Sequence, residues 1–375
     1  MNHSWVEISR SALIHNSTII KQLIYPSHLA VVVKANAYGH GILEIAQIVD
    51  TIPDVHMICV AQVEEAVQLQ KSGIKKTFLS LAYMPENCHD AIKNTIALAL
   101  YNLHDAQRLH EAALLLDKQA VVHVKIDTGM SRLGIAPQEA VAFIQFVHKH
   151  FPRITIAGIF THLGDKDQTD ISFSEKQLAL FDTMLAELHQ AGIRIPLTHA
   201  LSSGVLEYAH DKKYSLARCG TNIYGLWSSD NSKKRAQCIM PGLELLPVLS
   251  WKSRIIQIKD IPAGSSVGYG KTFIAANPMK IAVISIGYAD GYPRALSNKG
   301  IVKIGNHYAP VIGIVSMNLT AVDITPVPDV CIGDHVTLLG PDTQISADAL
   351  AQLTGTINIE ITTRISSTIK RIVVD

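Results

Sequence analysis

VVVKANAYGHG, at residues 31–41, runs from three β-branched residues through Lys34 into a turn that contains Gly39 and Gly41. The valines predict a buried strand, and the glycines predict that the chain turns directly after it. A lysine at the end of a buried strand is poorly hydrated, and its amine can form a Schiff base with a carbonyl cofactor. Most lysines that end a strand only return the chain to solvent, so the meaning of Lys34 depends on the rest of the chain.

Seven more short apolar runs follow the first one, and amphipathic segments of helical period separate them up to about residue 225. Two of these segments end at Gly73 and Gly192, where a helix C-cap favours glycine. Eight strand-then-helix units predict a (β/α)8 TIM barrel in an α/β protein. The expected strands cover residues 29–33, 57–61, 76–81, 95–100, 120–126, 154–160, 197–201 and 215–219.

A second, mostly-β domain is expected after the barrel. The polar stretch 228–237, SSDNSKKRAQ, predicts a linker, and it divides the chain into a barrel over 1–235 and a β-rich domain over 236–375. In the second part, only residues 346–353 have a helical pattern. The expected strands lie within 248–258, 280–288, 300–305, 309–324 and 334–340.

Composition excludes several classes of partner. The chain has 375 residues, with 33 Lys and Arg against 32 Asp and Glu, and a formal net charge of +1. This balance gives no electrostatic footprint for nucleic acid or an anionic membrane, and it favours a small neutral or zwitterionic ligand. No apolar stretch has the length of a membrane span, and residues 1–16 lack a basic region followed by an apolar core. A cytoplasmic protein is therefore expected.

Neither a disulfide framework nor a metal site is expected. The five cysteines are odd in number and scattered, without a CxxC pair. His162 lies near Asp165 and Asp167, and we interpret this group as a loop with one useful histidine rather than as a set of metal ligands.

Polar residues follow five of the expected barrel strands, at the end where such barrels have their active sites. These residues are Lys34, Lys125, Arg132, His162, Ser202, Ser203, Arg218 and Gly220. Strand ends are commonly polar, but five such ends on one face of a barrel indicate a site.

The loops after the seventh and eighth strands, SSG and CGT, predict a phosphate site, because these loops bind phosphate in many such barrels. Ser203 precedes an expected helix at 204–210 whose first amides could donate to a phosphate, and Gly220 would let the backbone approach it. Alternatively, Ser202 or Ser203 only caps that helix. A phosphate site across the barrel mouth from a lysine amine suggests pyridoxal phosphate.

Seven motifs along the chain resemble those of bacterial alanine racemases in order and spacing. They are VVVKANAYGHG, KIDTGMSRLG, GIFTHL, ARCGTNIYGL, GYGKTF, GYADGYPR and GIVSMN. The resemblance covers nearly the whole chain, from Trp5 to about Arg371. It implies a barrel that binds pyridoxal phosphate, a β domain and a head-to-tail homodimer that interconverts L-alanine and D-alanine.

The resemblance also implies two catalytic bases. Lys34 would hold the cofactor and act on one face of the substrate, and Tyr269 would act on the other face in the active site of the partner subunit. Racemisation needs such a pair, because one group removes the α-proton and another delivers a proton to the opposite face. A tyrosine is a poor base at neutral pH unless cations stabilise its phenolate, and His162 and Arg132 would supply that setting.

Other roles follow from the resemblance in the same way. Arg132 and the backbone of Met317 would bind the substrate carboxylate, and Lys125 matches a lysine that is carbamylated in many relatives. Arg218 would donate to the pyridine nitrogen without protonating it. The expected cofactor-binding residues are Lys34, Tyr38, His162, Ser202, Ser203, Arg218, Gly220 and Thr221.

Four residues depart from the family pattern and leave the substrate range open. Ile359 replaces a tyrosine that shares the phosphate, and Ser202, Thr221 and Asn318 replace the usual asparagine, isoleucine and aspartate. A racemase for serine or basic amino acids therefore stays an alternative, as does a pyridoxal-phosphate carrier without turnover. A decarboxylase with the same barrel is less favoured, because no motif matches its catalytic cysteine. The resemblance further implies a role in supplying D-alanine for peptidoglycan.

Overall fold

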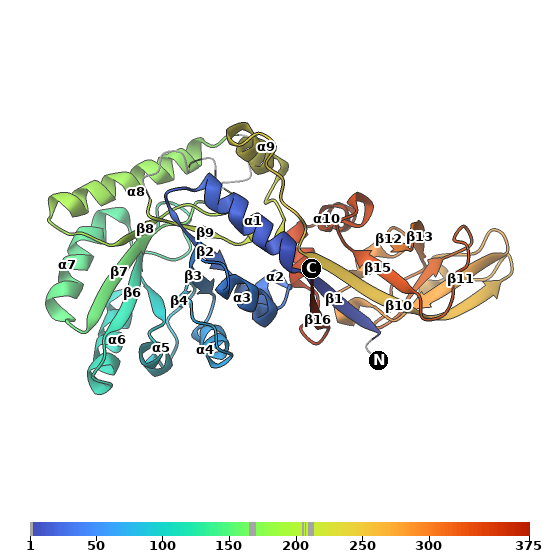
Figure 1. Cartoon of the computed structure of the whole chain (residues 1–375), viewed down its shortest axis with the longest axis horizontal. Coiled ribbons are helices and arrows are strands. Elements are labelled where there is room, and N and C mark those ends of the chain that lie inside the picture. The colour runs from blue at the N-terminus through green and yellow to red at the C-terminus, as the bar shows by residue number, and fades with distance from the viewer. Residues whose placement is uncertain (1–2, 165–169, 205, 207, 209–213) are drawn as a thin grey trace.

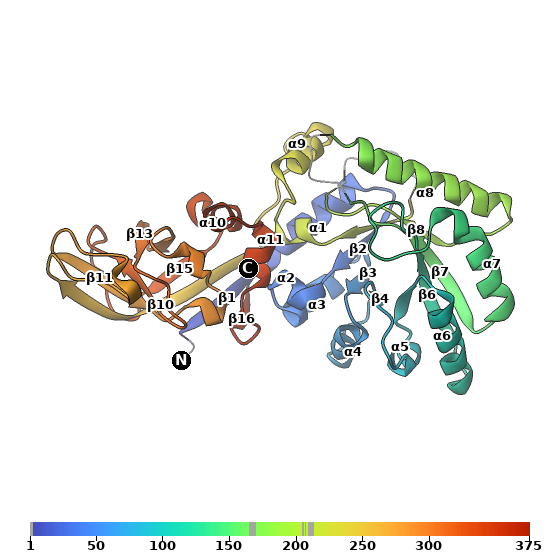
Figure 2. The ribbon, with the colours of Figure 1, turned by 180° about the vertical axis from the view of Figure 1, so that it is seen from behind.

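Two sheets organise the protein, one in each of two lobes that lie side by side along its longest axis (Figure 1). The structure is a computed structural model that describes residues 3–164, 170–204, 206, 208 and 214–375. Figure 2 shows the molecule from behind, and the N-terminus lies in the lobe that does not contain the barrel.

The first sheet is the expected barrel. Within the described residues it has eight parallel strands in the order β8-β7-β6-β5-β4-β3-β2-β9, and a bridge between Ser202 and Arg218 links its two end strands. The prediction of a TIM barrel is confirmed, with strand ends shifted by a few residues. The strands are β2 (His28–Val32), β3 (Val55–Val60), β4 (Thr77–Ser80), β5 (Ala97–Leu100), β6 (Ala120–Lys125), β7 (Ile154–Phe160), β8 (Leu197–His199) and β9 (Leu216–Cys219).

Helices surround the barrel because the β-branched residues on the outer face of its strands need an apolar cover. Buried Val31, Ile58 and Val124 belong to one apolar cluster with helical residues such as Ile45 and Leu109. The covering helices are α1 (Arg10–Leu23), α3 (Ile42–Asp50), α4 (Val63–Lys71), α5 (His89–Lys93), α6 (Leu103–Leu115), α7 (Ala140–His150) and α8 (Ser172–Gln190). None of the helices described is long and apolar enough to cross a membrane.

The second sheet is largely antiparallel and has the strand order β11-β14-β13-β12-β15-β10-β1-β16. The long strand β10 also pairs with β11, so the sheet curls back on itself. Each expected strand segment of this domain contains a strand. The strands are β1 (Ser4–Ser9), β10 (Leu249–Ile261), β11 (Met279–Ile284), β12 (Ile301–Ile304), β13 (His307–Ile312), β14 (Thr320–Asp323), β15 (His335–Leu339) and β16 (Lys370–Val374).

Both ends of the chain contribute to this second sheet. β1 pairs with β10 in antiparallel and with β16 in parallel, where Trp5 is opposite Lys370. The sequence division at residue 235 does not describe this placement of β1, because pairing between distant segments leaves no local pattern. The chain thus begins in the second lobe, builds the barrel and then returns.

Two helices were not expected. The stretch 228–237, predicted to be a linker, is helical rather than irregular: it contains α9 (Asp230–Ile239), which Ser229 caps by accepting a hydrogen bond from the Ser232 amide. Its faces are mostly polar, so it lacks the apolar period that marks a helix. After the expected helix, α10 (Ala347–Thr354), a further short one, α11 (Asn358–Thr363), is formed by residues with β-branched side chains.

Candidate active site

The barrel brings the polar residues at its strand ends to one mouth. Lys34 follows β2 after one residue, Val33, while Lys125 ends β6, His162 follows β7 and Arg218 lies in β9. Parallel strands in a barrel share the direction of their carboxyl ends, so these side chains come from the same face. The mouth is therefore the candidate active site.

Lys34 starts a turn of unusual backbone. The next four residues, Ala35 to Tyr38, all have φ between 53° and 55°, and Gly39 follows at 86°. The left-handed conformation costs an L-residue roughly 1–2 kcal/mol, so surrounding contacts must hold it. The Ala37 amide donates to the carbonyl of Val33 at 2.8 Å, and the Asn36 side chain accepts from the Ile42 amide at 2.9 Å. We call residues 34–39 the lysine turn.

Glu65, on α4, supports the same turn from the barrel side. Its carboxylate accepts hydrogen bonds from the amides of Ala35, at 3.2 Å, and Ala61, at 2.8 Å. One side chain thus links the lysine turn to the loop after β3.

Tyr38, Ser203 and Gly220 form a small polar cradle at the end of the lysine turn. A β-carbon on Gly220 would lie 2.4 Å from the Tyr38 hydroxyl oxygen, so the two groups touch because residue 220 has no side chain. The Gly220 amide donates to Ser203 Oγ at 3.0 Å. Buried Ser202 Oγ has no hydrogen-bond partner among the described residues. Burial raises the pKa of Tyr38, which therefore stays a phenol and can donate.

This cradle fits a phosphate. Its hydroxyls and backbone amides are the donors that proteins use for that group, and an unpaired buried hydroxyl calls for a partner. Thr221, also buried, begins the short helical turn after Gly220. The expected helix at 204–210 falls largely on residues that the structure does not describe.

Arg218 is held in the barrel interior by neutral acceptors. It is 4% exposed, and its Nη atoms donate to the carbonyls of His199, at 3.0 Å, and Thr161, at 2.7 Å. Arg218 Nη1 also lies 2.7 Å from His199 Nδ1, and His162 Nδ1 lies 3.5 Å from Nη2. Burial lowers the pKa of Arg218 to about 10, so it keeps its charge at neutral pH. No carboxylate among the described residues contacts it.

The contact with Arg218 fixes the hydrogen positions of two buried histidines. Because a guanidinium only donates, His199 Nδ1 must accept, and burial lowers the pKa of His199 well below its usual range. The neutral His199 ring then carries its proton on Nε2, which lies 2.8 Å from His123 Nδ1. His123 Nδ1 is therefore the acceptor. A row of three side chains runs from the mouth into the barrel.

Positive charge gathers at the mouth. Burial, followed by the charges of Arg132 and Arg218, lowers the pKa of Lys125 to about 8. Asp127 is the nearby carboxylate, and its oxygens accept from the amides of Gly129, Ser131 and Arg132. Although partial burial opposes the change, these hydrogen bonds lower the pKa of Asp127. The mouth thus has more cations than anions and favours an anionic ligand.

Tyr269 and Met317 lie in the other lobe. Tyr269 begins a short helical turn, Tyr269–Lys271, in the segment between β10 and β11, and it is 71% exposed. Met317 is 56% exposed, and its carbonyl accepts from the Ala289 amide at 2.9 Å.

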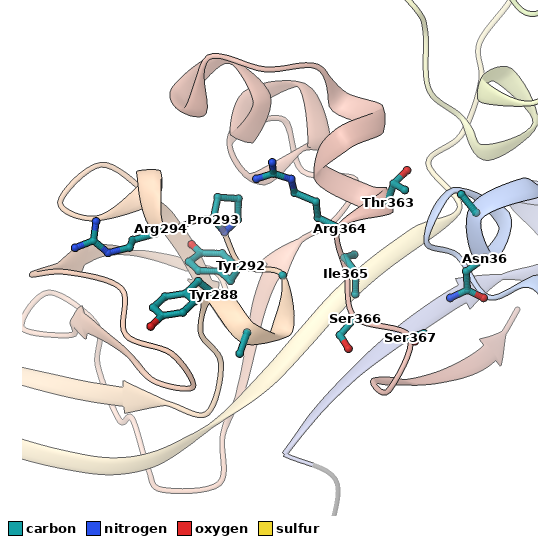
Figure 3. A pocket seen from close by; sticks show the side chains of 13 residues that line it. Asn36, Tyr288, Tyr292, Pro293, Arg294, Thr363, Arg364, Ile365, Ser366 and Ser367 are labelled. Carbon is teal, nitrogen blue, oxygen red and sulfur yellow. The ribbon is translucent and has the colours of Figure 1, made fainter.

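A cavity of about 800 Å³ lies where the lysine turn meets the second lobe (Figure 3). Asn36 lines it from the turn, Tyr288 and Arg294 from the loop after β11, and Arg364 and Ser366 from the segment after α11. The turn is open to solvent on this side, and Lys34 and Ala35 are both exposed, so the expectation of a poorly hydrated lysine is wrong for the single chain.

Sequence reasoning missed three residues near the site: His123, His199 and Arg371. His123 precedes Lys125 by two positions and so shares its face of β6, which was an available signal. His199 and Arg371 depend on contacts between distant segments. The described residues contain no group of three or more His, Cys, Asp or Glu side chains that could hold a metal ion, and Asp165 and Asp167 are outside them.

Comparison with known proteins identifies the family. A model of the alanine racemase N-terminal domain matches residues 8–228, and a model of its C-terminal domain matches residues 248–373. The chain belongs to the alanine racemase family. This match confirms the prediction, made from the sequence motifs, that the chain is a member of the pyridoxal-phosphate-dependent alanine racemases.

Individual alanine racemases are similar over the full length. The alanine racemase of Syntrophobacter fumaroxidans is 40% identical over 367 residues, which cover 96% of this chain and 95% of that protein. The structure of the alanine racemase of Clostridium difficile 630 has a TM-score of 0.92 at 33% identity and covers 100% of this chain and 96% of that one. The enzyme from Bartonella henselae, with covalently bound pyridoxal phosphate, has a TM-score of 0.85 at 29% identity, and the match covers 100% of both chains.

Proposed function

We propose that this protein is a pyridoxal-phosphate-dependent alanine racemase in which Lys34 and Tyr269 are the two bases. The observation that carries the proposal is the lysine turn, which begins with the amine of Lys34 just after β2 and places the Tyr38 hydroxyl against Gly220. An amine and a phosphate cradle joined by one short turn match the two ends of this cofactor.

The cradle and the barrel interior would hold the cofactor. Tyr38, Ser202, Ser203, Gly220 and Thr221 would bind its phosphate, and Lys34 its carbonyl carbon. When bound, pyridoxal phosphate withdraws electrons from the substrate Cα and so makes the α-proton more acidic.

Arg218 and His162 would act on the ring side. Because a guanidinium stays protonated, Arg218 would donate a hydrogen bond to the pyridine nitrogen but would give it no proton. The neutral partners of Arg218 and its burial keep this donor in a single direction.

The cations of the mouth would bind the substrate carboxylate. Arg132 supplies the guanidinium, and the backbone of Met317 supplies a further donor. Lys125, with its lowered pKa, has a larger neutral fraction at neutral pH than an ordinary lysine, and a neutral amine can react with carbon dioxide. We infer a carbamate on Lys125, whose negative charge would orient Arg132.

Tyr269 requires a second subunit. The exposed side chains of Tyr269 and Met317, both in the second lobe, are features of a surface that covers the mouth of another chain. We infer a head-to-tail homodimer in which each Tyr269 moves a proton at Cα on the face opposite to Lys34.

The cellular setting completes the proposal. Five free cysteines suit a reducing compartment, and the protein would work in the cytoplasm and supply D-alanine for peptidoglycan. Ile359, Ser202, Thr221 and Asn318 keep a racemase for serine or basic amino acids as the second candidate, because these positions bear on the phosphate site and its approach.

Exchange of the α-proton in deuterated water tests the activity. Purified protein with pyridoxal phosphate should racemise alanine and place deuterium at Cα, and Lys34→Ala should abolish both. Exchange with serine or lysine but not alanine would favour the second candidate. Absence of exchange with every amino acid would favour a carrier and contradict the proposal.

Mixed dimers test the sharing of sites. Lys34→Ala and Tyr269→Phe, each inactive alone, should together form dimers in which one of the two sites has both native residues. Recovered activity in the doubly tagged mixed dimer is expected. If mixing recovers nothing although mixed dimers form, Tyr269 does not act in the partner's site.

A further inference from the structure

The lysine turn is in contact with the last strand of the second lobe through Arg371. This residue is 7% exposed and lies in β16. Its Nη2 donates to the carbonyl of Gly39 at 2.8 Å, and its Nε lies 3.3 Å from the same oxygen. Two nitrogens of one planar group thus bind the carbonyl that closes the lysine turn.

The same guanidinium also binds its own segment. Its Nη1 donates to the carbonyl of Ser366 at 2.6 Å, and its Nη2 lies 3.2 Å from the carbonyl of Ile365. These carbonyls belong to the segment that borders the cavity in Figure 3. Arg371 therefore ties the lysine turn to the edge of the second lobe.

Packing around the glycines leaves no room for the turn to shift toward that lobe. A β-carbon on Gly39 would lie 1.9 Å from the carbonyl oxygen of Thr362 in α11. A β-carbon on Gly41 would lie 2.9 Å from Arg371 Cγ and 2.4 Å from a carboxylate oxygen of Glu44. Glu44 is the charged group that acts on Arg371, so the cation is partly balanced.

The strained backbone of the lysine turn needs contacts that hold it in place. Four successive L-residues at positive φ persist only where the surroundings define their conformation, because each brings its β-carbon close to the following carbonyl. The barrel supplies Glu65 and the chain's own turn supplies Asn36, but the Gly39 end is held from the second lobe. Without that hold, the turn can relax to an ordinary backbone, and Lys34 and Tyr38 lose their fixed separation.

We propose that Arg371 is a positioning residue that presets Lys34 and Tyr38 for the cofactor by holding the carbonyl of Gly39. The cofactor half of this inference rests on the proposed function, whereas the ordering of the turn does not. Arg371 is hydrogen-bonded to the carbonyls of Gly39, Ile365 and Ser366 and would act on the cofactor only through the lysine turn.

Arg371→Met tests whether Arg371 holds the carbonyl of Gly39, because methionine keeps much of the buried aliphatic part of the side chain and removes every hydrogen-bond donor. Arg254→Met is the matched control, since Arg254 also donates to a carbonyl, that of Gly333 at 2.9 Å, in the same sheet but away from the turn. Both full-length proteins are stripped of pyridoxal phosphate. Hydrogen exchange of residues 34–41, the melting temperature and the dissociation constant for pyridoxal phosphate are then measured.

In Arg371→Met, the backbone amide hydrogens of residues 34–41 should exchange faster than in both the wild type and Arg254→Met. Its dissociation constant for pyridoxal phosphate should rise about tenfold, as expected if a tenth of the molecules hold a competent turn. Arg371→Lys, which keeps the charge but not the paired donors, should lie between the wild type and Arg371→Met. This variant also decides the matter if Arg371→Met does not fold.

Two outcomes overturn the inference. In the first, Arg371→Met and Arg254→Met have similar melting temperatures, equal amide exchange rates in residues 34–41 and equal dissociation constants for pyridoxal phosphate. The other is faster exchange with unchanged affinity, which would make Arg371 a structural tie only. Failure of the wild type to bind pyridoxal phosphate would instead reject the proposed function, while the exchange of the stripped proteins would still report on the turn.

Discussion

The Tyr38 hydroxyl and the α-carbon of Gly220 are in contact, and a β-carbon on residue 220 would lie 2.4 Å from that oxygen. Gly220→Ala should therefore displace Tyr38 from the cradle. Loss of one hydrogen bond to a charged group costs about 1.5–3 kcal/mol, so the dissociation constant for pyridoxal phosphate should rise roughly tenfold to a hundredfold. A fluorescence titration measures it. Gly340→Ala, where the nearest atom lies 3.4 Å away, is the control, and equal affinities in both variants would contradict the cradle.

The row from Arg218 through His199 to His123 predicts different effects for two substitutions. His123→Leu leaves the buried His199 Nε2–H without an acceptor, which costs about 1–3 kcal/mol in the free energy of unfolding. His123→Asn places an amide oxygen near the lost Nδ1 and should recover most of that loss. Because the row directs Arg218, the absorption spectrum of bound cofactor should change in His123→Leu and return in His123→Asn. Identical spectra in all three proteins would show that His123 does not influence Arg218.

Lys125 should carry a carbamate whose amount depends on pH. Only the neutral amine reacts with carbon dioxide, forming a carbamate and releasing a proton, and burial with Arg132 and Arg218 lowers its pKa to about 8. The carbamate should therefore increase as pH rises toward that value. After incubation with 13C-bicarbonate, 13C NMR should show a carbonyl resonance that Lys125→Met lacks. Spectra that are the same for both proteins above pH 8 would rule out the modification.

Asp342 should make the second lobe sensitive to acid. Hydrogen bonds from Lys303 and Tyr308, each 2.7 Å long, lower the pKa of Asp342 to about 2. A carboxyl whose folded pKa is depressed stabilises the fold above its unfolded pKa, and this contribution is lost as pH falls toward the folded value. Asp342→Asn should lower the melting temperature at pH 7, and the difference from the wild type should shrink toward pH 2.

A second aspartate provides the comparison for that experiment. Asp117 forms an ion pair with Arg153, and its side chain is 88% exposed. Because an exposed ion pair stabilises the fold little, Asp117→Asn should lower the melting temperature less than Asp342→Asn does. A pH-independent difference for Asp342→Asn would mean that lost packing, rather than charge, explains its effect.

The barrel could be predicted from the sequence because its order is local. Each strand, such as the one before Lys34, is a short β-branched run, and each covering helix has an apolar stripe that repeats along the chain. The helix Asp230–Ile239 could not be predicted because its residues are mostly polar. The helix Asn358–Thr363 could not be predicted because it is short and rich in β-branched residues.

The contacts that complete the site could not be predicted from local patterns. Arg371 and Gly39 are more than 300 positions apart, and His199 in β8 meets His123 in β6 over the intervening strand β7. Such pairs depend on how whole sheets are assembled, and a single sequence contains no periodicity that reports them. The roles of the site residues came from the family resemblance and stay predictions until the variants above are measured.

The position of the first strand sets an order of events during synthesis. Ser4–Ser9 leaves the ribosome before any barrel strand, yet its neighbours, Leu249–Ile261 and Lys370–Val374, emerge long afterwards. The barrel, which ends near Cys219, can form as a unit while synthesis continues. Arg371 can bind the carbonyl of Gly39 only after the ribosome has released the strand Lys370–Val374. Until then, a nascent chain holds a formed barrel with an unfinished lysine turn, and the site becomes ready for the cofactor only when that strand has joined the sheet.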